Sequence, residues 1–405
     1  MFGSGGEAVV LLFKAAILTL AGCLAGKLAK SAGVSKLFGY LLAGLILGPS
    51  LFSLISGAEL AALFIAGEVV LAVVAFKIGS ELVFKDLQGV DRSFLAITLG
   101  EVAGTVFAVF GLLYFLLRQD LTFSLIMATA AVGSAPTAAL MVMRQYRARG
   151  AVASTLLPVA AVNGVLGVVL FALVLSLARA HGAVQGGGSG WQLVSTPLLE
   201  LGGSVILGGV LGVIFAFLAK KAGDTDELLI MSLAMILVAA GGAYLLGLSP
   251  LVANIVLGLM LANLGSGAPR VFFCLNSFTP PIYLLFFTLV GASLQLAGLL
   301  PLLALGAAYI LARAAGKLLG TWVGAWAAQA EPKVQKYLGV LLLPQGGVSL
   351  ALAALLHRYF PQYSGTFTVI MVLSVLLLEA LGPRLARAAF ARAEEVTGLG
   401  RQLIG

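Results

Sequence analysis

Residues 133–137 read Gly-Ser-Ala-Pro-Thr and interrupt a long apolar segment, residues 121–143. A second interruption, Pro-Gln-Gly-Gly at 344–347, divides the apolar segment 334–356 in the other half of the chain. Proline removes a backbone donor and glycine weakens a helix, so both segments are predicted to be broken helices. In a bilayer a broken helix is tolerated only where it is buried in protein or lines a cavity. We therefore expect two breaks that cross near the middle of a membrane, at Pro136, Pro344, Gly346 and Gly347.

The composition supports a membrane location. The chain has 405 residues, of which 61% are hydrophobic and 10% are charged, and its mean hydropathy is +1.11. A soluble domain carries about 25% charged residues, so this chain cannot cover the surface of a water-soluble globule. That excludes a cytosolic enzyme, a secreted disulfide scaffold and a disordered protein. The apolar runs are continuous rather than alternating, which favours helices over strands and predicts an all-α membrane protein in a lipid bilayer.

About thirteen apolar segments are long enough to cross a hydrocarbon layer of ~30 Å. They are residues 8–26, 37–55, 61–83, 93–117, 121–143, 151–179, 192–219, 227–247, 249–264, 271–296, 298–328, 334–356 and 364–390. Lysine and arginine residues gather on one set of the connecting loops, whereas the other set holds Arg118, Arg179 and Arg358. Because basic loops stay in the cytoplasm, we expect the N-terminus outside and the C-terminus inside. The net charge of +8 is thus a topology signal, and we expect no nucleic-acid partner.

The two halves of the chain contain a repeat. Three glycines recur in order at an offset of about 212–214 residues, namely Gly44 and Gly258, Gly79 and Gly291, and Gly104 and Gly316. The offset spans an odd number of predicted helices, so the two copies are inverted in the membrane. Inverted repeats are typical of secondary transporters. Chance similarity among apolar helices is the alternative.

Ionisable side chains within the spans are functional candidates, because each costs at least ~2.5–3.5 kcal/mol at the bilayer centre. Glu101 is the most central acid of its span, and its counterpart in the repeat is Arg313. A buried Glu101–Arg313 pair would offset much of the cost of burying each charge, whether the pair is static or moves. Lys317 lies one turn from Arg313 on the same helix face. Glu68 is a second candidate carboxylate.

Uncharged oxygen ligands are also expected. Asn163 lies in the middle of its span and can ligate a cation through its carbonyl oxygen or hydrogen-bond to another helix. Ser134, Thr137 and Gln345 lie at the two breaks, where half-helix ends and freed carbonyls are available to an ion. The two cysteines and two histidines have no metal-ligand spacing, so we expect neither a metal site nor a cofactor. No hydrolase, zinc-protease or P-loop motif is present, so we expect no enzyme activity.

Several segments resemble one family of transporters. Gly39–Ser50 (GYLLAGLILGPS) resembles the second-helix signature of the monovalent cation/proton antiporter-2 family. Further segments are similar to that family in the same order, namely 134–150 (SAPTAALMVMRQYRARG), 248–263 (LSPLVANIVLGLMLAN), 313–320 (RAAGKLLG) and 341–347 (LLLPQGG). The resemblance implies thirteen helices with two crossed broken helices. It also implies an exchange of sodium or potassium for protons by an elevator-type motion, in a homodimer of a bacterial inner membrane.

The resemblance also implies a division of labour within one polytopic membrane domain, residues 1–405. Residues 61–180 and 271–390 are expected to form mainly the ion-translocating core. Residues 8–55 and 192–264 are expected to form mainly the scaffold and the dimer interface. The soluble regulatory domain that many members carry is not expected here.

One departure from the family concerns its ion-binding aspartate. Members of the family carry an aspartate as the second residue of a pair in the sixth span, and this sequence has Asn163-Gly164 there. Since neither residue titrates near neutral pH, proton coupling is expected to fall on Glu101 or Glu68. Two alternatives stay open, namely a divergent transporter of an anion or organic solute and a non-transporting membrane subunit.

Overall fold

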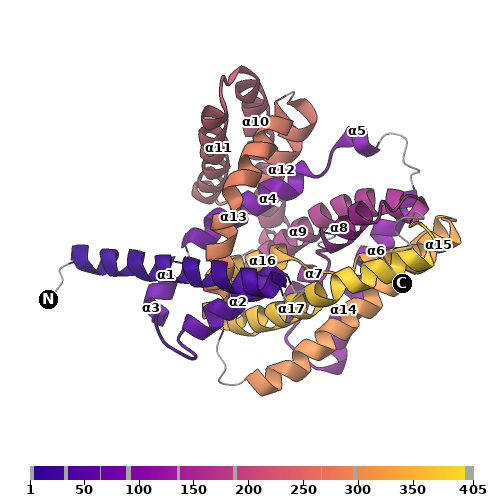
Figure 1. The fold of residues 1–405 in the computed structure, drawn as a ribbon, viewed down its shortest axis with the longest axis horizontal. Coiled ribbons are helices and arrows are strands. Elements are labelled where there is room, and N and C mark those ends of the chain that lie inside the picture. Colours follow the sequence, from indigo (N-terminus) through magenta and orange to yellow (C-terminus); the bar gives the residue numbers. More distant parts are fainter. Residues whose placement is uncertain are drawn as a thin grey trace. The chain divides into compact units, whose positions relative to one another are not determined.

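A computed structural model describes residues 4–31, 35–63, 65–87, 93–134, 137–185, 189–265, 267–294 and 299–396. Every regular element within these residues is a helix, which confirms the all-α prediction (Figure 1). In chain order the elements are α1 (Ser4–Ser31), α2 (Lys36–Leu47), α3 (Gly57–Leu63), α4 (Ile65–Ser80), α5 (Phe84–Leu87), α6 (Ser93–Phe110), the π-helix η1 (Gly111–Leu116), α7 (Leu121–Ala130), α8 (Thr137–Gln145), α9 (Ala151–Gln185), α10 (Gln192–Lys221), α11 (Thr225–Leu245), α12 (Pro250–Leu264), α13 (Ala268–Ala292), α14 (Leu299–Ala327), α15 (Pro332–Leu341), α16 (Gly347–Tyr359) and α17 (Pro361–Arg392).

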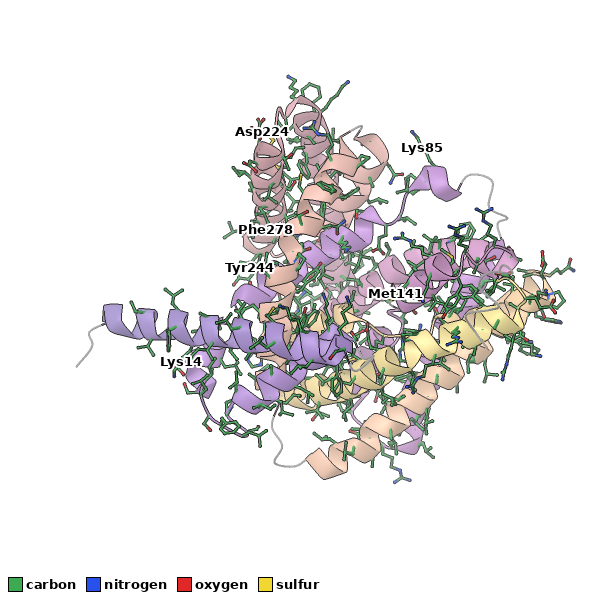
Figure 2. All side chains as sticks on the ribbon, viewed as in Figure 1. Lys14, Lys85, Met141, Asp224, Tyr244 and Phe278 are labelled. Atoms are coloured by element: carbon green, nitrogen blue, oxygen red, sulfur yellow. The ribbon has the colours of Figure 1, made fainter. Side chains whose placement is uncertain are left out.

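The helices are those of an integral membrane protein. Among the described residues, eight helices are long and apolar enough to cross a bilayer, and α2, α7 and α12 are shorter apolar helices. Large apolar side chains such as Phe13 on α1 and Ile206 on α10 are mostly exposed, as expected for a surface in contact with lipid. Charged side chains gather instead near helix ends, where Figure 2 shows Lys85 on the short helix α5 and Asp224 at the turn before α11.

Each predicted span corresponds to one helix or to two consecutive elements. The span 121–143 is divided into α7, which ends at Ala130, and α8, which begins at Thr137. The span 334–356 is divided into α15, which ends at Leu341, and α16, which begins at Gly347. Both predicted breaks are therefore confirmed, although Pro136 itself lies outside the described residues. Two further spans are also divided, 61–83 into α3 and α4 and 93–117 into α6 and η1.

The chain forms two compact units. The first unit comprises Met1–Leu71, Asn276–Ala307 and Leu350–Ala380, and the second comprises Ala72–Leu275, Ala308–Ser349 and Leu381–Gly405. Within the first, α1 packs along α2; within the second, α10, α11 and α12 lie side by side (Figure 1). The division into a moving core and a scaffold concerns motion and stays a prediction.

Glycines bring helix backbones together in the first unit. A Cβ atom on Gly44 of α2 would lie 1.9 Å from the carbonyl oxygen of Thr288 on α13. A Cβ on Gly291 of α13 would lie 2.1 Å from the carbonyl oxygen of Leu41 on α2. The backbones of α2 and α13 therefore touch at a point where no larger residue fits.

The second unit contains the repeat counterpart of this contact. A Cβ on Gly258 of α12 would lie 2.0 Å from the carbonyl oxygen of Phe76 on α4, and one on Gly79 of α4 would lie 1.8 Å from that of Ile255 on α12. The repeat converts α2 into α12 and α13 into α4, so it converts the first contact into the second. The same helix pair is thus built twice, and the predicted repeat is confirmed in the packing.

The third pair of repeated glycines brings α6 and α14 together within the second unit. A Cβ on Gly104 of α6 would lie 2.7 Å from the carbonyl oxygen of Gly316 on α14, and one on Gly316 would lie 2.6 Å from that of Gly104. Two residues that are equivalent in the repeat therefore contact each other between α6 and α14, the helices that carry the predicted charges.

Candidate functional site

Arg313 of α14 holds the two helix breaks through their backbone carbonyls. Its Nε donates to the carbonyl oxygen of Ala131 at 2.9 Å, its Nη2 to Gly133 at 2.9 Å, and its Nη1 to Leu343 in the second break at 2.6 Å. These three carbonyls directly follow the C-terminal ends of α7 and α15, where the helix dipoles are negative. The rigid, five-donor guanidinium of the fully buried Arg313 neutralises both ends at once.

Lys317 and Ser134 join the breaks one helical turn further along. The Nζ of Lys317 donates to the carbonyl oxygen of Val132 and to the Oγ of Ser134, both at 2.8 Å. The Oγ of Ser134 in turn donates to the carbonyl oxygen of Leu342 in the second break at 3.0 Å. These bonds connect the first break directly to the second, as the predicted crossing requires.

Glu101 of α6 is the acid of the site, and it forms an ion pair with Lys317. Both side chains are completely buried, with 0% of their area exposed. The Oε1 of Glu101 accepts from Lys317 and from the Oγ1 of Thr105 at 3.2 Å, and its Oε2 accepts from the Nδ2 of Asn163 at 2.6 Å. Every neighbour in this set donates to the carboxylate, as suits an ionised carboxylate, which only accepts.

Asn163 of α9 contributes an oxygen that has no partner. Its Nδ2 is directed to Glu101, and it also approaches the Oγ of Ser134 at 3.5 Å. This fixes the amide orientation, because the reverse would set the carbonyl oxygen against a carboxylate. The Oδ1 is buried and makes no hydrogen bond. An unsatisfied buried acceptor costs about 1–3 kcal/mol, so this oxygen suits a cation or a water.

Gly164, which follows Asn163 on α9, has room for a Cβ atom. A Cβ there would meet the Cγ2 of Ile78 at 3.5 Å, which is an ordinary van der Waals contact. A Cβ atom therefore fits at this position without a close contact.

The predicted contact between Glu101 and Arg313 is replaced by one between Glu101 and Lys317. The repeat makes Glu101 and Arg313 equivalent, but equivalent residues need not touch. Gly104 lies against Gly316 and Gly100 against Gly320, so α6 and α14 run in opposite directions and a residue further along α14 faces Glu101. Arg313 instead donates hydrogen bonds to backbone carbonyls in the two breaks.

Gln345 lies in the second break with a different set of partners. Its Nε2 donates to the Oγ of Ser349 at 2.8 Å and approaches the hydroxyl oxygen of Tyr309 at 3.5 Å. Tyr309 and Thr105 were not among the predicted residues. Each lies one turn from a predicted charge, Tyr309 before Arg313 and Thr105 after Glu101, and this spacing was the available signal.

For two other predicted ligands the role in the site stays a prediction. Glu68 belongs to the first compact unit, where it pairs with Arg358 at 2.6 Å and keeps 56% of its side-chain area exposed. The side chain of Thr137 lies outside the described residues. The structure thus brings together Glu101, Lys317, Asn163 and Ser134, with Arg313 behind them.

Comparisons with known proteins agree with this architecture. Residues 15–384 match the family described as the transmembrane sodium/hydrogen exchanger. A similar solved structure is that of the sodium proton antiporter MjNhaP1 from Methanocaldococcus jannaschii at pH 8, with 20% sequence identity and a TM-score of 0.76 over 95% of this chain and 99% of that chain. At this identity the likeness shows the fold alone. A search of curated proteins found no match to the chain. Because the family match covers most of the sequence, the chain belongs to the sodium/hydrogen exchanger family of membrane transporters and is not an enzyme.

Proposed function

We propose that the chain exchanges a monovalent cation, sodium or potassium, for protons. The observation that carries the proposal is the buried Glu101–Lys317 pair beside the unpartnered Oδ1 of Asn163. The family match and the fold of an antiporter support it.

The pair couples cation binding to proton release because both ligands need the same carboxylate. In this structure the ammonium of Lys317 forms an ion pair with the carboxylate of Glu101. A dehydrated cation needs an anionic ligand, so it binds Glu101 only after Lys317 has moved away and given up its proton. Asn163 Oδ1 and Ser134 Oγ then supply neutral oxygen ligands. When the cation leaves, Lys317 takes up a proton and returns to Glu101.

The charge balance of this exchange is one to one. Among the described residues of the cluster, Glu101 supplies the one negative charge, and Arg313 remains bound to carbonyls. A single cation therefore replaces a single proton, and the net charge of the site is equal in both loaded states.

Access alternates by an elevator-type movement of a core formed mainly by residues 61–180 and 271–390. The scaffold formed mainly by residues 8–55 and 192–264 stays fixed as the interface of a homodimer. The protein lies in a bacterial inner membrane, with its N-terminus outside and its C-terminus in the cytoplasm. Support for this orientation comes from the positively charged loops.

The test is cation-dependent proton flux in proteoliposomes that contain a pH-sensitive dye, screened over sodium, potassium and lithium. Wild type is compared with Glu101→Gln and Lys317→Gln, and Thr105→Val is the matched control because it removes one neutral bond to the same carboxylate. We expect both charge variants to lose pH-dependent exchange and the control to keep it. Unchanged exchange in Glu101→Gln would refute coupling through this pair.

A second candidate, transport of an anion or organic solute, is favoured by one observation. Two basic side chains, Arg313 and Lys317, face a single acid in the cluster, so its net charge is positive. The same vesicles loaded with chloride or a small carboxylate test this candidate. If wild type shows no cation-dependent flux but Gly164→Asp confers it, the native chain has lost antiport, and the second candidate or a non-transporting role replaces the first.

A further inference from the structure

We propose that Glu395, near the C-terminal end of the described chain, is a positioning residue for the ion site and acts through α9. This inference rests on the proposed function, because it concerns the same site. It assigns to residues 393–396 the role of a clamp that fixes the first turns of the helix that carries Asn163.

The carboxylate of Glu395 occupies the N-terminus of α9. It accepts hydrogen bonds from the backbone amides of Val152 at 2.7 Å and Ala153 at 2.9 Å. The backbone amide of Arg149 donates to the carbonyl oxygen of Glu395 at 2.9 Å. Only 7% of the surface of Glu395 is exposed, although it is a charged residue. A buried carboxylate on helix amides is a charge-assisted contact that also suits the positive end of the helix dipole.

The chain leaves room for this carboxylate at Gly150. A Cβ on Gly150 would lie 2.4 Å from both the Cδ and the Oε1 of Glu395, and the residue has a φ of +156°. Glycine is thus required there for two separate reasons, the space and the backbone conformation. Only Glu395 of the two neighbouring glutamates occupies this position, because Glu394 is exposed and pairs with Lys333 at 3.0 Å.

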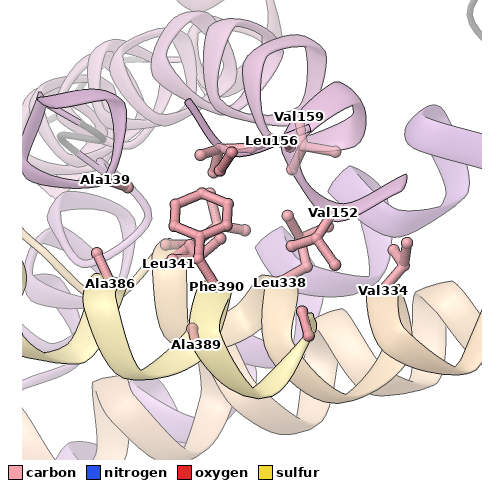
Figure 3. Packing of buried hydrophobic residues seen from close by; sticks show 14 of the residues in the cluster. Ala139, Val152, Leu156, Val159, Val334, Leu338, Leu341, Ala386, Ala389 and Phe390 are labelled. Atoms are coloured by element: carbon pink, nitrogen blue, oxygen red, sulfur yellow. The ribbon is translucent and has the colours of Figure 1, made fainter. Parts of the chain in front are cut away.

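The clamp also lies in one apolar cluster with α8, the second half of the first broken helix, and with α15, the first half of the second. Figure 3 shows Phe390 of α17 packed between Leu156 of α9 and Leu341 of α15, with Ala139 of α8 in the same cluster. Ala393 and Val396, on either side of Glu395, are buried in this cluster as well. The three elements α8, α9 and α15 therefore converge on residues 390–396.

The first turns of α9 need such an anchor because Pro158 lies within them and leaves the continuous helix with one hydrogen bond fewer. Proline has no N–H, so the hydrogen bond from residue 158 to the carbonyl of Ser154 is missing. The direction of residues 151–157 is then set by tertiary contacts. Asn163 lies ten residues beyond Ala153, about 15 Å along the axis, and its Nδ2 must stay within hydrogen-bonding distance of Glu101.

The experiment compares Glu395→Gln with Glu394→Gln, its exposed neighbour, in the full chain. Glutamine keeps the shape of the side chain but sets an amide donor against helix N–H groups. In proteoliposomes we expect Glu395→Gln to raise the cation concentration for half-maximal proton flux by about tenfold, with a smaller change in maximal flux. An effect of this size is usual for residues that hold a ligating side chain in place without touching the ion. Glu394→Gln leaves both quantities unchanged. A purely structural role would lower maximal flux through loss of folded protein and leave the half-maximal concentration as it is.

Hydrogen exchange of the purified protein separates failure of the clamp from failure of the proposed function. We expect the amides of residues 151–163 to exchange faster in Glu395→Gln than in wild type, whether or not wild type transports a cation. If wild type shows no flux, the proposed function is wrong and the exchange measurement alone decides on the clamp. Wild-type amide exchange and a wild-type half-maximal concentration in Glu395→Gln would overturn the inference.

Discussion

Replacing the two members of the Glu101–Lys317 pair one at a time and together tests how the site is held. In Glu101→Gln the fully buried ammonium of Lys317 loses its counter-ion. The Nε2 of the new glutamine would also have to face a hydrogen-bond donor. That donor is Asn163 in one orientation of the amide, and Lys317 in the other. Removal of one partner of a buried pair costs about 3–5 kcal/mol. Lys317→Gln costs less, because two donors to Glu101 remain.

The double variant Glu101→Gln/Lys317→Gln leaves no buried charge, and two facing amides can hydrogen-bond to each other. Replacement of both members of a buried pair is often close to neutral, so the double variant should be more stable than Glu101→Gln alone. The interaction energy then falls at the upper end of the usual range of about 0.5–3 kcal/mol. The assay is reversible unfolding of the four proteins in mixed detergent micelles. Additive losses in the double variant would show that the two charges are not coupled and would refute the pairing.

Four further results are expected. Arg313→Lys should lower the free energy of unfolding by at least about 2 kcal/mol, because one ammonium cannot reach three carbonyls in two breaks, and unfolding in micelles measures this. Gly44→Ala should cost about 1–3 kcal/mol in the same assay, whereas Gly241→Ala, which has open space around it, should be neutral or slightly stabilising. Exchange should proceed at the same rate with and without a membrane potential set by a potassium ionophore, since one cation replaces one proton. Hydrogen bonds from Lys14, and from the backbone amide and hydroxyl of Ser56, lower the pKa of Glu59 from 4.5 to about 2. Their contribution to stability is therefore complete above pH 4.5 and is lost as the pH falls toward 2. Lys14→Gln should weaken this part of the pH profile of unfolding, and the bonds from Ser56 should preserve the rest.

The breaks and the repeat were predictable because their signals are local or periodic. The Pro/Gly stretches at 133–137 and 344–347 weaken a helix whatever surrounds them, and both breaks were found where expected. The repeated glycines were visible as spacings along the chain. Their meaning in the fold, two equivalent helix contacts and a third contact between α6 and α14, depends on which helices face each other.

The partners of the charges were harder to predict. The acceptors of Arg313 are backbone carbonyls, which every residue has, so no side-chain pattern identifies them. The choice of Lys317 over Arg313 as the partner of Glu101 depends on the register of two antiparallel helices. Glu68 was predicted as a ligand from its place within an apolar segment. It lies in the first turn of α4, where its side chain is exposed and pairs with Arg358.

The site arises where the two repeats differ in charge while their backbones remain alike. The repeat that superimposes Gly104 on Gly316 also superimposes Glu101 on Arg313 and Thr105 on Lys317. The counterpart of the Glu101–Lys317 pair is therefore Arg313 opposite Thr105, and a hydroxyl cannot neutralise a guanidinium. Arg313 consequently takes the helix carbonyls, and Thr105 adds a bond to Glu101 instead. Arg313 thus supports the two breaks, and Glu101 keeps Lys317 as the partner that, in the proposed function, a cation replaces.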